Sequence, residues 1–244
     1  MILGSRRRAA VRPLAVLAAA LAALALPPAA AAQDRGPPSQ PPGGFDARVG
    51  RAPGAELDAL VGKPRIVDSD HYNFDDAVSG ERRMAGWVEA EIVIDAPVRY
   101  VAAAINDPTA FPSFMPMILG AEVLEESPGR QLIRYRVGIR FLGFEVGYAT
   151  IEESVFEWLP NGSGVNRSRL IDSPDGNMFE HYVSVYIEPV YLSGREMCYL
   201  RYFNRPGLRK PFPGMLSVAK AFIPGGTRSQ LQAIEKEAKR LAGR

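Results

Sequence analysis

Apolar and polar residues alternate along much of the chain after residue 86. In the clearest run Ile133, Tyr135 and Val137 alternate with Arg134, Arg136 and glycine. A period of two is typical of a strand with one buried and one solvated face. Turns rich in Pro, Asn, Gly and Ser separate such runs, which predict strands at 88–94, 121–126, 133–141, 144–152, 164–171, 178–187 and 196–204. We therefore expect an antiparallel sheet with one wet face.

One segment between the predicted strands changes to a helical period. Residues 98–105 have apolar side chains at spacings of three and four, and Asp95 is placed to cap this helix. Asp107 followed by Pro108 predicts a second helix start, which two further prolines keep short. This proline-rich turn is expected to present Phe111, Phe114, Met115 and Met117.

The last 30 residues predict an amphipathic helix with an interruption. Apolar positions recur at helical spacing within 215–222 and again within 231–241. Pro224, Gly225 and Gly226 lie between them and predict a break or sharp kink. The preceding segment 211–214 is interpreted equally well as a gating loop or a rigid turn.

The strand ending in Ile94-Asp95-Ala96-Pro97, the apolar helix and the run NDPTAFPSFMP at 106–116 together resemble a known family. They are similar to the opening of START-like (SRPBCC, helix-grip) proteins, whose bacterial members include a polyketide cyclase or coenzyme Q-binding START-like branch. The resemblance covers 86–244. It implies an α+β helix-grip fold, with a curved antiparallel sheet of about six or seven strands around a long C-terminal helix and a ligand pocket between them.

The N-terminus predicts export. Residues 1–32 combine Arg6, Arg7, Arg8 and Arg12 with the apolar run 14–26 and three alanines before Gln33, as in a secretory signal peptide; an uncleaved anchor is the alternative. We expect a periplasmic or secreted protein, with the export route left open. Residues 33–55, rich in Pro and Gly, predict a flexible tether, and 56–85 an N-terminal extension.

Charge and cysteine usage exclude some partners. Without the four arginines of 1–32, the 29 basic residues become 25 against 27 acidic ones, a net charge of −2, so nucleic acid is not an expected partner. Cys198 is the only cysteine and predicts a buried, inert thiol. Basic positions at 134, 136, 140, 167 and 169 suggest either a stripe for anionic surfaces or, preferably, ion pairs with Glu145, Glu152 and Glu153.

No catalytic or metal motif stands out, and we expect neither metal nor cofactor. The chain has two histidines. His71 lies among Asp68, Asp70, Asp75 and Asp76, where a solvated loop is favoured over a metal site. His181, which shares a predicted strand face with Phe179 and Val183, is either a ligand-orienting group or a hydrogen-bonded core histidine.

These observations and the resemblance lead to two functional hypotheses. The first is an exported monomeric carrier of a lipid or other apolar small molecule, with transient contact to a membrane surface. The alternative is a cyclase-like enzyme acting on a polyketide or aromatic substrate through Tyr135, Tyr182, His181 or Glu180; a binding module that uses its outer arginines is a third possibility. The expected ligand contacts are Phe111, Phe114, Met115, Met117, Tyr135, Phe141, Phe144, Tyr148, His181, Phe212, Met215, Val218, Ala219 and Phe222.

Overall fold

A computed structural model describes residues 48–141 and 144–244 of the chain. The predicted signal peptide, 1–32, and residues 33–47 of the predicted tether lie outside this part. The elements in chain order are η1 (Leu57–Leu60), β1 (Arg65–Asp75), β2 (Arg82–Ile94), α2 (Val98–Asn106), η2 (Pro108–Ala110), α3 (Phe111–Phe114), β3 (Ile118–Ser127), β4 (Arg130–Phe141), β5 (Phe144–Trp158), β6 (Gly164–Asp172), β7 (Met178–Leu192), β8 (Arg195–Arg209) and α4 (Met215–Leu241).

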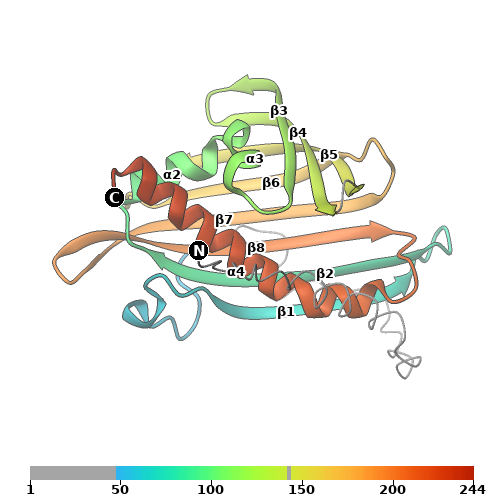
Figure 1. The fold of residues 1–244 in the computed structure, drawn as a ribbon, viewed down its shortest axis with the longest axis horizontal. Helices are drawn as coiled ribbons and strands as arrows, with labels where there is room; N and C mark the ends of the chain where they lie inside the picture. Colours follow the sequence, from blue (N-terminus) through green and yellow to red (C-terminus); the bar gives the residue numbers. More distant parts are fainter. Residues whose placement is uncertain (1–47, 142–143) are drawn as a thin grey trace, which may run out of the picture. The chain divides into compact units, whose positions relative to one another are not determined.

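All eight strands form one antiparallel sheet in the order β1-β2-β8-β7-β6-β5-β4-β3 (Figure 1). Strands β3 to β8 follow one another as hairpins, and β8 returns to pair with β2. The helices α2 and α3 fill the long connection between β2 and β3. This is the predicted α+β architecture, with eight strands instead of six or seven.

The additional strand, β1, corrects the prediction of a solvated loop around His71. Residues 65–75 pair with 82–91 along their whole length. On one face of this hairpin Tyr72, Phe74 and Ala85 form a buried apolar cluster, and on the other His71 is only 2% exposed. The polar composition misled the prediction because β1 is an edge strand whose aspartates can remain at the surface.

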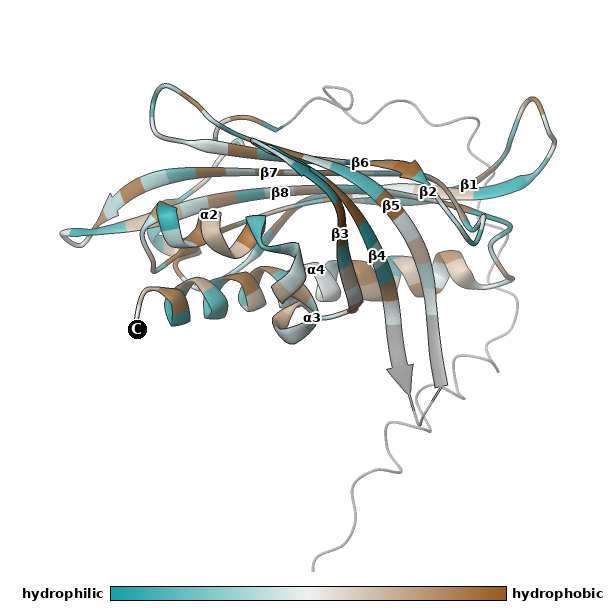
Figure 2. Ribbon diagram, turned by 90° about the horizontal axis from the view of Figure 1, so that it is seen from above, coloured by the Kyte–Doolittle hydropathy of each residue, from teal (hydrophilic) through white to brown (hydrophobic). Residues whose placement is uncertain are grey.

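All helices longer than one turn lie on one face of the sheet, which we call the inner face (Figure 2). The main core forms there, where α2 and the end of α4 pack on β2, β7 and β8. Its fully buried members include Ile92, Ile187, Leu200 and Leu231, each with an exposed fraction of 0%. Burial of aliphatic side chains of this size stabilises the fold by about 2 kcal/mol each.

The final helix is continuous, so the predicted break at 224–226 is wrong. α4 runs from Met215 to Leu241 with Pro224 inside it. A proline removes one backbone hydrogen bond and crowds the carbonyl four residues earlier. Here that carbonyl belongs to the exposed Lys220, so solvent can hydrate it. The helix therefore keeps its direction without satisfying every internal hydrogen bond.

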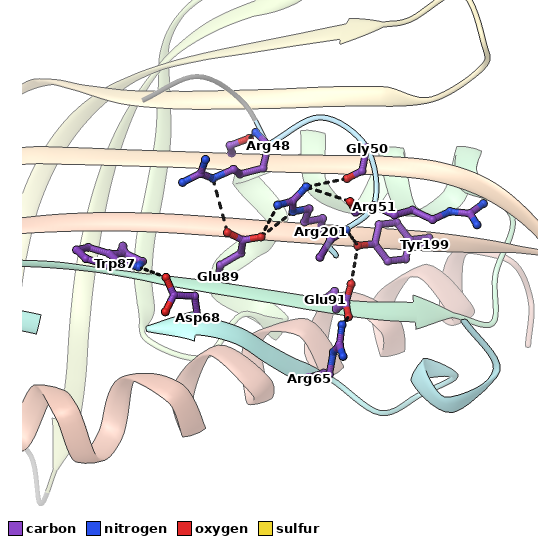
Figure 3. A network of polar contacts seen from close by, with 12 residues as sticks. Arg48, Gly50, Arg51, Arg65, Asp68, Trp87, Glu89, Glu91, Tyr199 and Arg201 are labelled. Atoms are coloured by element: carbon purple, nitrogen blue, oxygen red, sulfur yellow. Dashed lines mark hydrogen bonds and ion pairs between the residues drawn. The ribbon is translucent and has the colours of Figure 1, made fainter. Parts of the chain in front are cut away.

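The outer face of the sheet is covered in part by the chain that precedes β1. Figure 3 shows a polar network in which the Tyr199 hydroxyl donates to Glu91 (2.6 Å) and accepts from the backbone N–H of Ala52 (2.9 Å). Arg201 donates to Glu89 (2.7 Å). These contacts hold residues 48–55, the end of the predicted tether, against the sheet.

In the part of the chain described here, no helix is both long and apolar enough to cross a membrane.

Candidate functional site

Strand pairing brings a charged pair, Glu152 of β5 and His181 of β7, onto the inner face. Val183 pairs with Asn204, which in turn pairs with Val88 of the main core. His181 lies two residues from Val183 and therefore shares its face. It extends toward β5, where Glu152 is only 3% exposed. The inner face thus carries a buried carboxylate beside an imidazole, away from the main apolar cluster.

The hydrogen-bonding partners of the Glu152 carboxylate come from its own strand and from two other strands of the sheet, β6 and β7. His181 Nδ1 donates to Oε1 at 2.7 Å, and Thr150 Oγ1 donates to the same oxygen at 2.9 Å. Ser168 Oγ donates to Oε2 at 2.7 Å. Three donors from β5, β6 and β7 therefore hold the carboxylate in one orientation, which a buried charge requires.

The two groups stabilise each other's charged forms. Burial by itself would raise the pKa of Glu152, but the charge of His181 and the three hydrogen bonds lower it overall. Burial would lower the pKa of His181, but the charge of Glu152 and its hydrogen bond raise it above the ordinary value of 6.5. The site therefore favours an imidazolium beside a carboxylate, a pair that can both donate and accept hydrogen bonds.

Aromatic residues lie next to this pair. Burial and then the charge of Glu152 raise the pKa of Tyr135, so its hydroxyl remains protonated. The Tyr135 ring is parallel to that of Phe111 from α3, with centroids 6.3 Å apart. Phe111 also contacts Phe114 edge to face, at 5.9 Å. The proline-rich turn thus places the Phe111 ring against Tyr135, which in turn lies near Glu152.

A second polar connection links the sheet to α4. Burial raises the pKa of the Tyr202 hydroxyl, and hydrogen bonds to Gln230 of α4 and to Asn204 oppose that rise. The Asn204 side chain also favours the protonated form of His181, although its Oδ1 has no hydrogen-bond partner of normal geometry. Polar groups therefore extend from Glu152 across the inner face to the helix.

The residues predicted on the proline-rich turn have different environments. Phe111, Phe114 and Met115 contact the main core, and Met115 is 8% exposed. Met117 is 51% exposed and has a positive φ of 69°, at the start of β3. The structure therefore stacks Phe111 on Tyr135, places Met115 in the core and leaves Met117 at the surface.

The predicted residues on and before α4 are mostly uncovered. Phe212 is 58% exposed, Val218 44% and Phe222 71%, whereas Ala219 is 8% exposed and Met215 is half-buried. Among described residues, the buried core members from this helix all come from its second half. The first half of α4 therefore lies over the sheet without contributing a buried apolar cluster of its own.

The remaining predicted contacts lie on β4 and β5. Tyr148 pairs with Val137, in register with Tyr135 and Thr150, and is half-buried on the inner face. Phe141 and Phe144 pair with each other at the end of the hairpin, and their side chains lie outside the described residues.

The four residues proposed for a cyclase-like reaction do not come together. Tyr135 and His181 are on the inner face, whereas Tyr182 and Glu180 belong to the outer face, where Glu180 forms an ion pair with Arg205. Phe179 does not share the face of His181 either. An irregularity between Met178 and Glu180 shifts the register, and the Phe179 ring packs on Phe74 of the outer face.

Glu152 is the main functional candidate that sequence reasoning missed. It was expected to pair with arginines on the solvated face, but it points inward. The signal that was missed is its position in the alternating pattern. Glu152 lies an even number of residues from Tyr148 and Phe156, which belong to the apolar face, so its side chain points to the same face. A carboxylate at such a position is buried once the strand pairs.

Where the structure describes them, the arginines of the outer face form ion pairs, as favoured from the sequence. The partners include Glu122 and Glu157, which were not predicted, as well as the predicted Glu153. Arg134 contacts Glu122 at 2.8 Å, Arg169 contacts Glu153 at 2.6 Å, and Arg167 contacts Glu157. The acidic residues around His71 do not converge. Within 48–141 and 144–244, no group of three or more His, Cys, Asp or Glu side chains is arranged to hold a metal ion.

No family model matches the chain, and no curated protein matches it. Solved structures do match. A STAR-related lipid transfer protein from Xanthomonas axonopodis is 15% identical with a TM-score of 0.51, over 72% of this chain and 98% of that one. Human StAR-related lipid transfer protein 5 is 12% identical with a TM-score of 0.53, over 73% and 88%. Zhui aromatase/cyclase from a Streptomyces species reaches a TM-score of 0.49 at 18% identity, over 64% and 94%.

At such low identities the likeness concerns the fold alone. The strand order, the helices on a single face and the long final helix all agree with it. The chain therefore has the helix-grip fold of START-like (SRPBCC) proteins.

Proposed function

We propose that this protein binds a lipid or other apolar small molecule between the inner face of the sheet and the first half of α4. The observation that carries the proposal is the buried Glu152–His181 pair beside the parallel rings of Phe111 and Tyr135. Ligand sites for apolar molecules typically combine apolar walls with a few fixed polar groups. Solved proteins of the same fold include two named as lipid transfer proteins, which supports this class of ligand.

The charged pair has a defined role in this proposal. The apolar body of the ligand contacts Phe111 and Tyr135, and a polar group of the ligand forms a hydrogen bond with the pair. Three donors already orient Glu152, so the ligand meets a prearranged site. Hydrogen bonds to charged groups contribute about 1.5–3 kcal/mol each, enough to determine the ligand's orientation.

The surface near the start of α4 fits contact with a membrane, where such a ligand would be loaded or released. Phe212 and Phe222 are exposed there, and so are Lys210 and Lys220, with 83% and 53% of their side chains exposed. Apolar side chains flanked by basic ones favour the surface of an anionic bilayer.

The direct test is native mass spectrometry of the purified protein, followed by solvent extraction and analysis of any released molecule. We expect one class of apolar molecule to co-purify. Glu152→Gln should reduce its occupancy at least tenfold, by removing the charge that orients it. Glu153→Gln is the matched control, because the neighbouring Glu153 faces outward and pairs with Arg130 and Arg169. Equal ligand loss in both variants, or no bound apolar molecule, would refute the proposal.

A second candidate is a cyclase-like enzyme acting on a polyketide or aromatic substrate in the same place. The hydrogen bond between His181 and Glu152, which raises the pKa of His181, favours it, because such a pair can serve as general acid and base. The two candidates differ in what happens to the ligand. A carrier releases the extracted molecule unchanged, whereas an enzyme converts an added aromatic polyketide analogue into a product that His181→Phe abolishes.

We also propose that the protein is exported and acts in the periplasm or outside the cell, on the basis of residues 1–32. N-terminal sequencing of the protein from its host tests this. A mature N-terminus near Gln33 is expected, and an intact Met1 in a soluble cytoplasmic fraction would contradict it.

A further inference from the structure

His71 of β1 is a buried polar residue on the inner face that the proposed function does not use. It pairs with Gly86 of β2, and a Cβ atom at Gly86 would lie 2.4 Å from His71 Cδ2. The imidazole therefore lies flat over the glycine, directed from the sheet edge toward its centre. Only a glycine at 86 leaves room for this orientation.

Two buried polar atoms at this position have no hydrogen-bond partner. They are Nε2 of His71 and Oδ1 of Asn73, and each is inaccessible to solvent. Asn73 lies two residues along β1 from His71 and so shares the inner face. Burying a polar atom without a partner destabilises the fold, so the two together call for a missing partner.

The strand register aligns the two histidines. His71 is opposite Gly86, the register of β2 and β8 brings Gly86 beside Pro206, and Pro206 is opposite His181. Three inter-strand steps separate the histidines, a distance of about 14 Å. Between them the sheet carries a glycine and a proline, so no long side chain from these two positions fills the row.

We propose that His71 and Asn73 form a second polar recognition point for the ligand, which binds a neutral hydrogen-bonding group such as a hydroxyl. This inference rests on the proposed function. It narrows the ligand to an elongated apolar molecule with polar groups at both ends, one near Glu152–His181 and the other near His71. The apolar middle of the molecule lies over Gly86 and Pro206.

The chemistry of the second polar recognition point, His71 and Asn73, favours a neutral ligand group over an ionised one. Burial, together with the charge of Lys220, lowers the pKa of His71 to about 4 despite the opposing charge of Asp70, so its imidazole is neutral. An unprotonated imidazole nitrogen and an amide oxygen can each accept a hydrogen bond from a hydroxyl. The protonated nitrogen of a neutral imidazole can donate a hydrogen bond to it. A carboxylate or phosphate would find no charged partner in the neutral imidazole and amide.

Matched probes test the inference. Dodecanediol has a hydroxyl at each end and dodecanol at one, and isothermal titration calorimetry measures the affinity of the purified protein for both. We expect His71→Phe to lower the ratio of diol to alcohol affinity about tenfold, with dodecanol affinity unchanged. Tyr72→Phe is the control: it removes another unpartnered buried oxygen, on the outer face, and should leave the ratio unchanged.

Each outcome has a distinct meaning. If dodecanol binds but His71→Phe and Asn73→Leu both keep the wild-type ratio, the second recognition point is wrong and the proposed function stands. If neither probe binds the wild-type protein, the proposed function fails. Asn73→Leu provides an independent variant if His71→Phe does not fold, and circular dichroism establishes folding for both.

Discussion

The two halves of α4 differ in how they are held. In the second half Leu231, Ile234 and Ala238 are at most 3% exposed and pack on α2 and the sheet. In the first half Val218 is 44% and Phe222 71% exposed. α4 lies over β1 and β2, where the inner face carries His71, and Glu152 and His181 lie on the same face of the sheet, on β5 and β7. One helix thus serves as a core element at one end and as the cover of a polar surface at the other.

This difference shows how a helix-grip fold can be stable and still receive a ligand. Tight packing at one end supplies the stability, so the other end need not be filled by the protein's own side chains. Pro224 lies between the halves, and the missing hydrogen bond there weakens the helix locally.

The largest expected change in stability comes from a substitution in the second half of α4, which is packed against the core. Leu231→Ala should lower the free energy of unfolding by about 2–5 kcal/mol, since it leaves a cavity around a fully buried site. Phe222→Ala in the uncovered half should change it by less than about 0.5 kcal/mol. Urea denaturation measures both. Similar losses in the two variants would show that the halves are equally packed.

The pH dependence of stability tests the buried His71. Its pKa is about 4 in the folded protein and 6.5 ordinarily, so between these values the unfolded chain binds more protons and stability falls as pH falls. The wild type should lose about 3 kcal/mol more than His71→Phe between pH 7 and pH 4. Urea denaturation across this range is the measurement, and parallel curves would mean that His71 is accessible to solvent.

The Glu152–His181 pair stabilises the sheet in a different pH window. The pKa of Glu152 is lowered from 4.5 and that of His181 is raised from 6.5. The contribution is therefore full between these values and lost as pH falls through the folded pKa of Glu152 or rises through that of His181. Glu152→Gln should cost about 2 kcal/mol near pH 5.5 and less near pH 9. Glu153→Gln should show no such dependence.

The smallest effect on stability should accompany a change in surface binding. Phe222→Ser should change stability by less than about 0.5 kcal/mol and weaken sedimentation with vesicles of phosphatidylcholine and phosphatidylglycerol. Val78→Ser is the control, because Val78 is 97% exposed in the turn between β1 and β2. Equal binding by both variants would exclude the start of α4 as the membrane contact.

Local signals predicted many elements correctly. All seven predicted strands are present, and Asp107 caps the second helix start by accepting from the backbone N–H of Ala110 at 3.3 Å. Asp95 was predicted to cap α2, which is wrong: Pro97 is the N-cap residue, and Glu196 of β8 accepts from the Val98 N–H at 3.2 Å. Local residue spacing predicts where a helix starts. The side chain that accepts a hydrogen bond from the first backbone N–H groups of the helix can come from a distant strand.

The candidate site was predicted only in part for a similar reason. Phe111, Tyr135 and His181 were named as ligand contacts. Phe111 stacks on Tyr135, and Tyr135 and His181 both lie on the sheet face that carries Glu152. Glu152, 29 residues from His181, was assigned to the wrong face. An irregularity in β7 likewise moved Phe179 away from His181, since one extra residue reverses the face of the preceding side chains.

The sequence by itself determined the antiparallel strands and the turns between them, because period, proline and glycine act within a few residues. The helix-grip architecture was implied by the resemblance to START-like proteins. Only the tertiary structure decided that 65–75 forms an edge strand, that α4 continues through Pro224, and that Glu152 meets His181. These outcomes depend on strand order, register and exposure. They arise from contacts between segments far apart in the chain, which no local pattern encodes.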